Sequence, residues 1–163
     1  MQFDVITIFP KIFDSFLQES LIKKSVQKKL NKIFIHDLRK WTHDKHKQVD
    51  DRPYGGGAGM VLMAPPVIEA VQEIKQKNKQ KKQRVVMLSP AGEQLTSKKI
   101  KQLIKFENLI LICGRYEGFD KRVDQVVDEK ISIGPYILSG GELPAMVLIE
   151  SLSRFLPDFL SNP

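Results

Sequence analysis

Four clusters of residues combine glycine and proline with charged or aromatic side chains, a mixture that suits ligand binding. They span residues 50–60, 88–92, 113–118 and 132–146. The last cluster reads as a short apolar strand, a loop with Gly134, Gly140 and Gly141, and the beginning of an amphipathic helix. Glycine lets the main chain approach a ligand closely, and a loop ahead of a helix N-terminus can hold a small polar ligand. A tight connection with turn glycines is the alternative.

The cluster at residues 113–118 carries side chains that suit a nucleobase. Tyr116 offers a ring for stacking, and Glu117 can accept hydrogen bonds from the donor edge of a base. Arg115 can bind a phosphate or a carboxylate. The alternative is a turn between a strand and a helix, in which the charges pair with each other, notably with Asp120 and Arg122.

The glycine run at residues 55–59 does not fit the nucleotide-binding templates. Met60 stands where the third glycine of a dinucleotide fingerprint belongs, and no Gly-Lys-Ser/Thr ending follows. This disfavours a phosphotransferase. The carboxylates, cations and aromatic side chain around it suit the binding of a polar base beside its phosphates. His43, His46 and the nearby aspartates lack the spacing of metal ligands, so no metal site is expected.

The elements between these clusters predict an α/β fold. Strands are expected at residues 3–9, 32–37, 84–89 and 109–113, and helices at 12–30, from 65 onward, at 96–106 and at 142–155. A turn is expected at 89–92, and no regular structure over 38–63. Apolar strands separated by helices indicate a mostly parallel sheet with helices on both faces. In such folds ligands bind beyond the carboxyl ends of the strands, so the loops at 89–92, 114–118 and 134–141 are predicted to converge on one pocket.

Composition narrows the class of protein. The 163 residues suit a single domain, and no apolar run is long enough to span a membrane. The single cysteine, Cys113, fits a reducing cytoplasm and a buried position. The net charge of +7 is gathered at residues 23–32, 75–84 and 98–105. Such patches attract RNA or DNA, although lysine-rich helix faces are often only solvated surface.

The four clusters, in this order, resemble the bacterial tRNA (guanine-N1)-methyltransferase family. The resemblance covers residues 1 to about 160. It implies a SPOUT-type α/β domain with a deep C-terminal trefoil knot, which works as a cytoplasmic homodimer on tRNA and not on DNA. It also implies transfer of a methyl group from S-adenosylmethionine to N1 of the guanosine immediately 3′ of the anticodon.

Site residues follow from the resemblance by position. Arg154, four residues after Glu150 and therefore also spaced for a helical ion pair, matches an arginine that assists catalysis. Asp50, Tyr54, Gly59 and Glu117 would face the target guanine. The residues expected to surround the methyl donor are Leu88, Ser89, Pro90, Gly114, Tyr116, Ile131, Ile133, Gly134, Pro135, Tyr136, Ile137, Leu138, Gly140, Gly141 and Pro144.

Two departures from the family pattern affect this expectation. Pro135 stands where the family usually has aspartate, which removes an N–H donor and a charge from the donor loop. The family also continues into a linker that carries a general base and into a helical C-terminal domain, both absent from this chain. We therefore expect a fragment, a truncated gene product or an engineered core that binds the donor and dimerises but methylates poorly. The alternative is a non-catalytic RNA-binding or dimerisation module that keeps the fold.

Overall fold

A five-stranded parallel sheet forms the centre of the molecule. The computed structural model describes residues 1–53 and 55–160. The strand order is β2-β1-β6-β5-β7, and every pair of neighbouring strands in this sheet is parallel. The strands are β1 (Gln2–Thr7), β2 (Lys32–Asp37), β5 (Gln83–Gln94), β6 (Asn108–Cys113) and β7 (Glu129–Ser132). The predicted α/β class with a mostly parallel sheet is confirmed.

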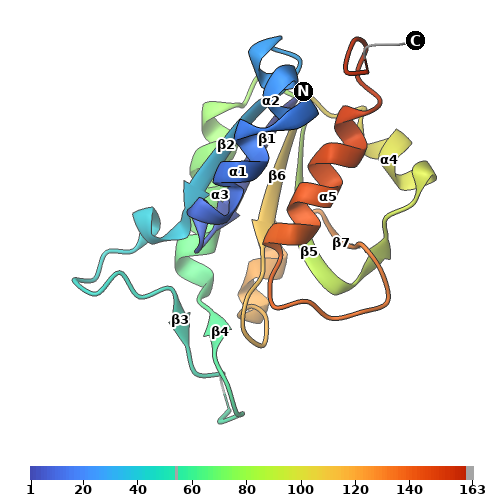
Figure 1. The fold of residues 1–163 in the computed structure, drawn as a ribbon. Coiled ribbons are helices and arrows are strands. Elements are labelled where there is room, and N and C mark those ends of the chain that lie inside the picture. Colours follow the sequence, from blue (N-terminus) through green and yellow to red (C-terminus); the bar gives the residue numbers. More distant parts are fainter. Residues whose placement is uncertain (54, 161–163) are drawn as a thin grey trace.

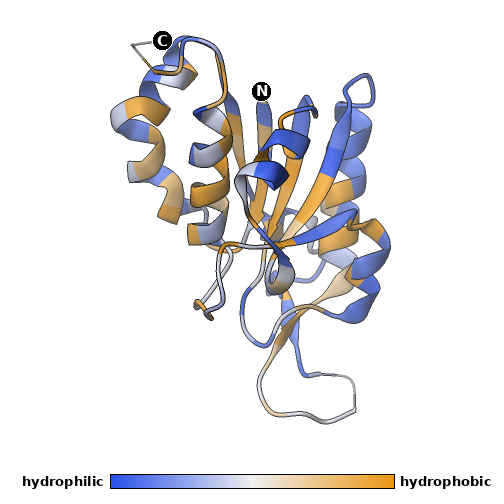
Figure 2. Ribbon diagram, turned by 90° about the vertical axis from the view of Figure 1, so that its right-hand side faces the viewer, coloured by the Kyte–Doolittle hydropathy of each residue, from blue (hydrophilic) through white to orange (hydrophobic). Residues whose placement is uncertain are grey.

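Apolar side chains cover both faces of the sheet, which explains why the strands lack polar alternation. In central strand β6, Leu109 and Leu111 contribute to one core cluster, and Ile110 and Ile112 to the other. Figure 1 shows α1 (Asp14–Gln18), α2 (Ser20–Gln27) and α5 (Glu142–Ser153) on the first face and α3 (Ala64–Lys77) on the opposite face. Figure 2 shows the apolar strands between these layers. Helices therefore cover both faces, as predicted.

The predicted helix over residues 12–30 is divided into three pieces. They are the 3-10 helix η1 (Pro10–Phe13), α1 (Asp14–Gln18) and α2 (Ser20–Gln27). Glu19 is extended, and Ser20 has a φ of 54°, in the left-handed region of the backbone that residues other than glycine rarely adopt. The prediction of a single helix was therefore wrong. It rested on apolar residues that recur at helical spacing on both sides of this break.

Residues 38–53 and 55–63 contain little regular structure, as predicted, but they are anchored at several points. The 3-10 helix η2 (Leu38–Trp41) packs on α3, and β3 (Asp50–Asp51) pairs with β4 (Val61–Leu62) in an antiparallel hairpin. Trp41, Val49 and Leu62 are buried. Figure 1 shows the hairpin extending from the body at the end where the strands of the sheet terminate.

Three further helices complete the layers. Helix α3 (Ala64–Lys77) begins with prolines in its first turn, α4 (Ser97–Leu103) follows Thr96, and α5 (Glu142–Ser153) follows the last cluster. Thr96 caps α4, because its side chain accepts a hydrogen bond from the Lys99 amide. A 3-10 helix, η3 (Lys121–Val126), precedes β7. Among the helices of the described residues, none combines the length and apolar character required to cross a bilayer.

Candidate functional site

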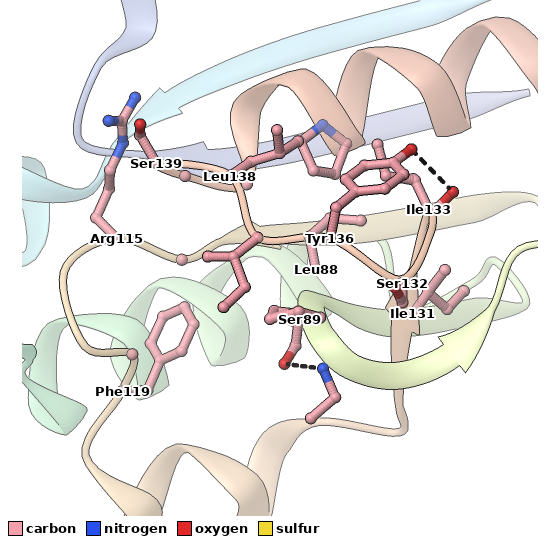
Figure 3. A pocket seen from close by; sticks show the side chains of 18 of the residues that line it. Leu88, Ser89, Arg115, Phe119, Ile131, Ser132, Ile133, Tyr136, Leu138 and Ser139 are labelled. Carbon is pink, nitrogen blue, oxygen red and sulfur yellow. Dashed lines mark hydrogen bonds between the residues drawn. The ribbon is translucent and has the colours of Figure 1, made fainter.

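A cavity of about 400 Å³ lies at the carboxyl ends of β6 and β7, beside residues 88–91 of β5. Its walls come from this part of β5 and from the segments that follow β6 and β7, as Figure 3 shows. The predicted convergence of the three loops is therefore confirmed. Its volume falls within the range that small-molecule and cofactor sites occupy.

Nearly all the residues expected around a methyl donor lie in this lining. The exception is Pro135, which is exposed on the donor loop and is not part of the wall. The lining residues from that expectation are Leu88, Ser89, Pro90, Gly114, Tyr116, Ile131, Ile133, Gly134, Tyr136, Ile137, Leu138, Gly140, Gly141 and Pro144.

Strand β5 forms the first wall in a way that the sequence did not reveal. The predicted end of the strand at Ser89 was wrong, because β5 continues to Gln94. Leu88 and Glu93 both stand opposite Ile131 of β7, so residues 89–92 bulge out of the ladder. A Cβ on Gly92 would lie 2.5 Å from the Ile131 amide nitrogen, so only glycine allows the chain to return to β7 here.

The segment after β7 forms the second wall and packs against the segment after β6. The Gly141 amide donates to the Gly114 carbonyl at 2.9 Å, and Arg115 and Gly140 form an isolated antiparallel bridge. A Cβ on Gly141 would lie 2.7 Å from the Cys113 Cα atom. The Tyr136 ring covers Gly134, and its hydroxyl donates to the Ile133 carbonyl at 3.3 Å (Figure 3). Close approach to main-chain atoms thus explains Gly141, and close approach to a side chain explains Gly134.

A buried carboxylate connects these two segments to β1. Glu142, the first residue of α5, is buried and accepts a hydrogen bond from the Thr7 hydroxyl at 2.7 Å. It also accepts from Arg115 Nε at 3.1 Å, and Arg115 lies over the Phe9 ring. Arg115 thus pairs with a carboxylate of its own chain. The sequence gives no local signal for this pair, because its members are 27 positions apart.

Cys113, the last residue of β6, is a buried apolar residue of the core. Burial raises the pKa of its thiol well above the ordinary value, and the Glu142 carboxylate raises it further. A thiol that stays protonated is a poor nucleophile. The structure therefore supports the packing role expected for this residue.

The residues expected to face a guanine are only partly brought together. Gly59 lies against Glu117, since a Cβ on Gly59 would be 2.6 Å from the Glu117 Cγ atom. The Glu117 amide donates to the Met60 carbonyl at 3.0 Å, and Glu117 lines the cavity. Asp50 is half-buried in β3 and is not part of the lining. Tyr54 lies outside the described residues.

Other charged groups near the site pair locally. Arg122 and Asp120 form an ion pair at 2.6 Å, and this hydrogen bond lowers the pKa of the Asp120 carboxyl. Charge pairing within this turn, the alternative considered above, is thus present for these two residues. Over residues 1–53 and 55–160 no cluster of His, Cys, Asp and Glu side chains has the arrangement needed to hold a metal ion.

Arg154 lies at the opposite end of α5 from the cavity. It follows the last turn of the helix, whereas Gly141 and Pro144 line the cavity at the first turn. The neighbouring Ser153 hydroxyl accepts a hydrogen bond from Asn31, which directly precedes β2 at the amino edge of the sheet. Arg154 is exposed, and within the described part of the chain it forms no ion pair with Glu150. The structure therefore does not bring Arg154 to the cavity of its own chain.

Comparison with known proteins identifies the family. The model of the family described as tRNA (Guanine-1)-methyltransferase TrmD matches residues 1–163. The tRNA (guanine-N(1)-)-methyltransferase of Ruminiclostridium cellulolyticum is 48% identical over 99% of this chain and 70% of its own length. That of Dictyoglomus turgidum is 44% identical over 100% of this chain and 65% of its own length.

A solved structure agrees with these relatives. The tRNA (m1G37) methyltransferase from Aquifex aeolicus has a TM-score of 0.90 and 41% sequence identity, over 100% of this chain and 73% of that one. The chain thus spans about two thirds of the length of its relatives. The fold shared with this structure and the family match over residues 1–163 lead to the same family as the motifs around the cavity. The chain belongs to the tRNA (guanine-1)-methyltransferase TrmD family.

Proposed function

We propose that this chain is the catalytic core of an enzyme that transfers a methyl group from S-adenosylmethionine to N1 of a guanosine in tRNA. The target would be the guanosine immediately 3′ of the anticodon. The observation that carries the proposal is the cavity in which the bulged part of β5 meets the segments that follow β6 and β7. Family membership and the activity named for the Aquifex aeolicus relative support the choice of reaction.

The cavity fits an adenosyl ligand in size and in the nature of its walls. A volume of about 400 Å³ suits a nucleoside with a short side chain. Ile133 to Leu138 supply main-chain amides and carbonyls for the adenine, while Leu88, Ile131 and Pro144 supply apolar contacts. When bound, the donor supplies an already activated methyl group. The protein therefore has to align the target nitrogen and remove its proton.

Glu117 is proposed to bind the target base. It lines the cavity beside Gly59, so its carboxylate can accept hydrogen bonds from the donor edge of a guanine next to the methyl donor. Asp50 and Tyr54 are proposed to contact the same nucleotide from the segment that carries the β3–β4 hairpin. The Leu62 amide donates to the Gly118 carbonyl at 2.9 Å, which ties this hairpin to the loop that carries Glu117.

Arg154 is proposed to stabilise the negative charge that develops on O6 of guanine as the N1 proton leaves. It cannot do so in its own chain, because α5 separates it from the cavity by about 15 Å along the helix axis. A second copy would have to supply it. We therefore propose a homodimer in which α5 lies near the cavity of the partner.

The outer face of α5 supports that assembly. Leu143, Val147 and Phe155 are exposed and lie four and eight positions apart, on one side of the helix and its end. Phe9 and Ile12 are exposed as well, in the segment that contacts α5. Exposed apolar side chains gathered in this way are typical of a protein–protein interface.

Further features of the family are proposed for this chain. One domain with a trefoil knot fits the topology: β7 pairs with β5 at the sheet edge, while residues 140 and 141 contact residues beyond β6. The basic patches fit tRNA, and we propose RNA over DNA because the relatives act on tRNA. The reduced, buried Cys113 fits action in the cytoplasm.

We propose that these 163 residues bind the donor but methylate tRNA poorly. Among the described residues that line the cavity, Glu117 is the only carboxylate, and base binding already occupies it. The general base would then come from residues that the longer relatives have in addition. A non-catalytic module that retains the fold is the second candidate, and the replacement of the family aspartate by Pro135 favours it.

Calorimetric titration with S-adenosylmethionine separates the two candidates. Binding with one site per chain supports the enzyme core, and heat indistinguishable from dilution favours the module. A methyl-transfer assay on unmodified tRNA follows, with a tRNA in which the target guanosine is replaced as the control. Running it with this chain and with a chain extended to the length of its relatives tests the proposed weakness of turnover.

A further inference from the structure

Lys99 is nearly buried, although it belongs to a lysine-rich segment. Its side chain is 9% exposed, and its Nζ atom lies 2.6 Å from Glu93 Oε2 and 3.0 Å from Glu129 Oε2. The neighbouring Lys98 is exposed and forms no ion pair among the described residues. One buried ammonium group therefore binds two carboxylates that belong to two different strands.

The two carboxylates stand on either side of the bulge in β5. Glu93 is the first residue after the bulge and returns to the ladder opposite Ile131. Glu129, two residues before Ile131, stands opposite Val86, which precedes the bulge. The bulge itself supplies Ser89, Pro90 and Ala91 to the cavity wall. Through these two ion pairs Lys99 connects Glu93, where β5 returns to the ladder after the bulge, to Glu129 of β7, the strand with which β5 pairs there.

Lys99 is itself held in place. It lies in the first turn of α4, where its amide donates to the Thr96 hydroxyl at 3.2 Å. Arg84 Nε donates to Glu129 Oε1 at 2.8 Å, which leaves the other oxygen of that carboxylate to Lys99. Burial by itself would raise the pKa of Glu129, but the hydrogen bonds from Arg84 and Lys99 outweigh it and lower this pKa. The hydrogen bond to Glu93 raises the pKa of Lys99, so the ammonium form persists.

We infer that Lys99 is a positioning residue for the methyl-donor cavity: by pairing with Glu93 and Glu129 it fixes the bulge at 89–92 against β7. It does not touch the cavity and acts through the wall segment. The identity of the ligand rests on the proposed function, whereas the effect of Lys99 on residues 89–92 does not. Ligand affinity and the mobility of these residues can therefore be measured separately on the same variants.

The test compares Lys99→Met with Lys98→Met as the matched control. Methionine keeps the apolar stem of lysine and removes the charge. For Lys99→Met we expect the affinity for S-adenosylmethionine to fall about tenfold, as for coupled groups of one network. We also expect faster amide hydrogen exchange over residues 88–95. Lys99→Arg should restore both values, and Lys98→Met should change neither.

Each other outcome is decisive. If Lys99→Met lowers the melting temperature while ligand affinity and exchange of residues 88–95 stay as in the parent chain, the positioning role is wrong. If the parent chain does not bind the ligand, the proposed function fails, and exchange alone decides the role of Lys99. If Lys99→Met does not fold, Glu93→Gln replaces it, because Glu93 is 66% exposed and its loss leaves the Lys99–Glu129 pair intact. Unchanged exchange in that variant would overturn the inference.

Discussion

Arg115 Nη2 lies 3.1 Å from Glu142 Oε2, and this ion pair joins the loop after β6 to the first residue of α5. The Glu142 side chain is 2% exposed and that of Arg115 is 21% exposed. The pair fixes the distance between two segments whose glycines form the cavity wall. Its removal should therefore affect stability and ligand binding together.

For Glu142→Ala we expect the free energy of unfolding to fall by about 1–3 kcal/mol, because the Thr7 hydroxyl and the Arg115 guanidinium lose their acceptor. Urea denaturation measures this loss. Affinity for S-adenosylmethionine should fall as well, by calorimetry at a temperature where the variant is folded. Glu150→Ala on the same helix, where the side chain is exposed, is the control and should leave both quantities unchanged. Equal effects of the two substitutions would contradict this account.

Gly141→Ala should be more harmful than its small size suggests. The added methyl group would meet main-chain atoms of Cys113 and Gly114 at 2.7 and 2.8 Å, and these atoms cannot turn away as a side chain can. We expect a loss of about 1–3 kcal/mol in unfolding free energy and loss of measurable ligand binding. Gly57→Ala is the matched control, since its nearest neighbours are Pro53 atoms at 3.7 Å. Wild-type binding by Gly141→Ala would show that the wall tolerates the shift.

Arg154→Ala tests the assembly proposed for catalysis. Because Arg154 is exposed and remote from the cavity, folding and donor affinity should not change. In a chain of the length of the relatives, the methylation rate should fall about 10²–10³-fold. Glu117→Ala should also be inactive, and mixed dimers of these two variants should regain activity, because one of the two sites is then intact. Failure of the mixture to regain activity would argue against a partner-supplied arginine.

The fall in the free energy of unfolding at acid pH should depend in part on Glu129. Its pKa in the folded chain lies below the ordinary value of 4.5, so the folded state favours the carboxylate. The stabilisation is present above that value and is lost as the pH falls through the lower, folded pKa. Glu129→Gln should therefore be less stable than the parent at pH 7, and the difference should shrink below about pH 4.5. Thermal melts from pH 7 to pH 3 measure this, with Glu150→Gln, at an exposed position of α5, as the control.

The sequence was sufficient to predict a mostly parallel sheet with helices on both faces and the segments that converge on the cavity, but not the order of the strands. Apolar strands mark a sheet covered on both faces, and glycine after a strand marks a loop that approaches a ligand. The break at Ser20 could not be predicted, because the apolar spacing on both sides is that of one continuous helix. The extension of β5 beyond Ser89 was also missed, since Pro90 and Gly92 have the composition of a turn, and Glu93 and Gln94 pair with β7 only in the tertiary structure.

The pairing of the charged residues could not be predicted from the sequence either. Lys99 was grouped with the basic surface, and only the structure shows that it is buried between two carboxylates. Arg115 had two plausible partners, and its actual partner, Glu142, is distant in sequence. Pairing of this kind depends on how the loops cross, which local composition does not encode. The distance of Arg154 from the cavity likewise follows from the length and direction of α5.

Because glycines that pack closely against neighbouring segments form part of the cavity wall, its binding properties should respond unusually to sequence change. Truncating an exposed side chain of the wall such as Ile137, which is 85% exposed, removes bulk and displaces no neighbouring atom. Adding a single carbon at Gly134, Gly140 or Gly141 intrudes on neighbouring atoms. Natural or engineered substitutions in this cavity should therefore be tolerated where they shorten an exposed side chain and should be harmful where they add atoms at these glycines.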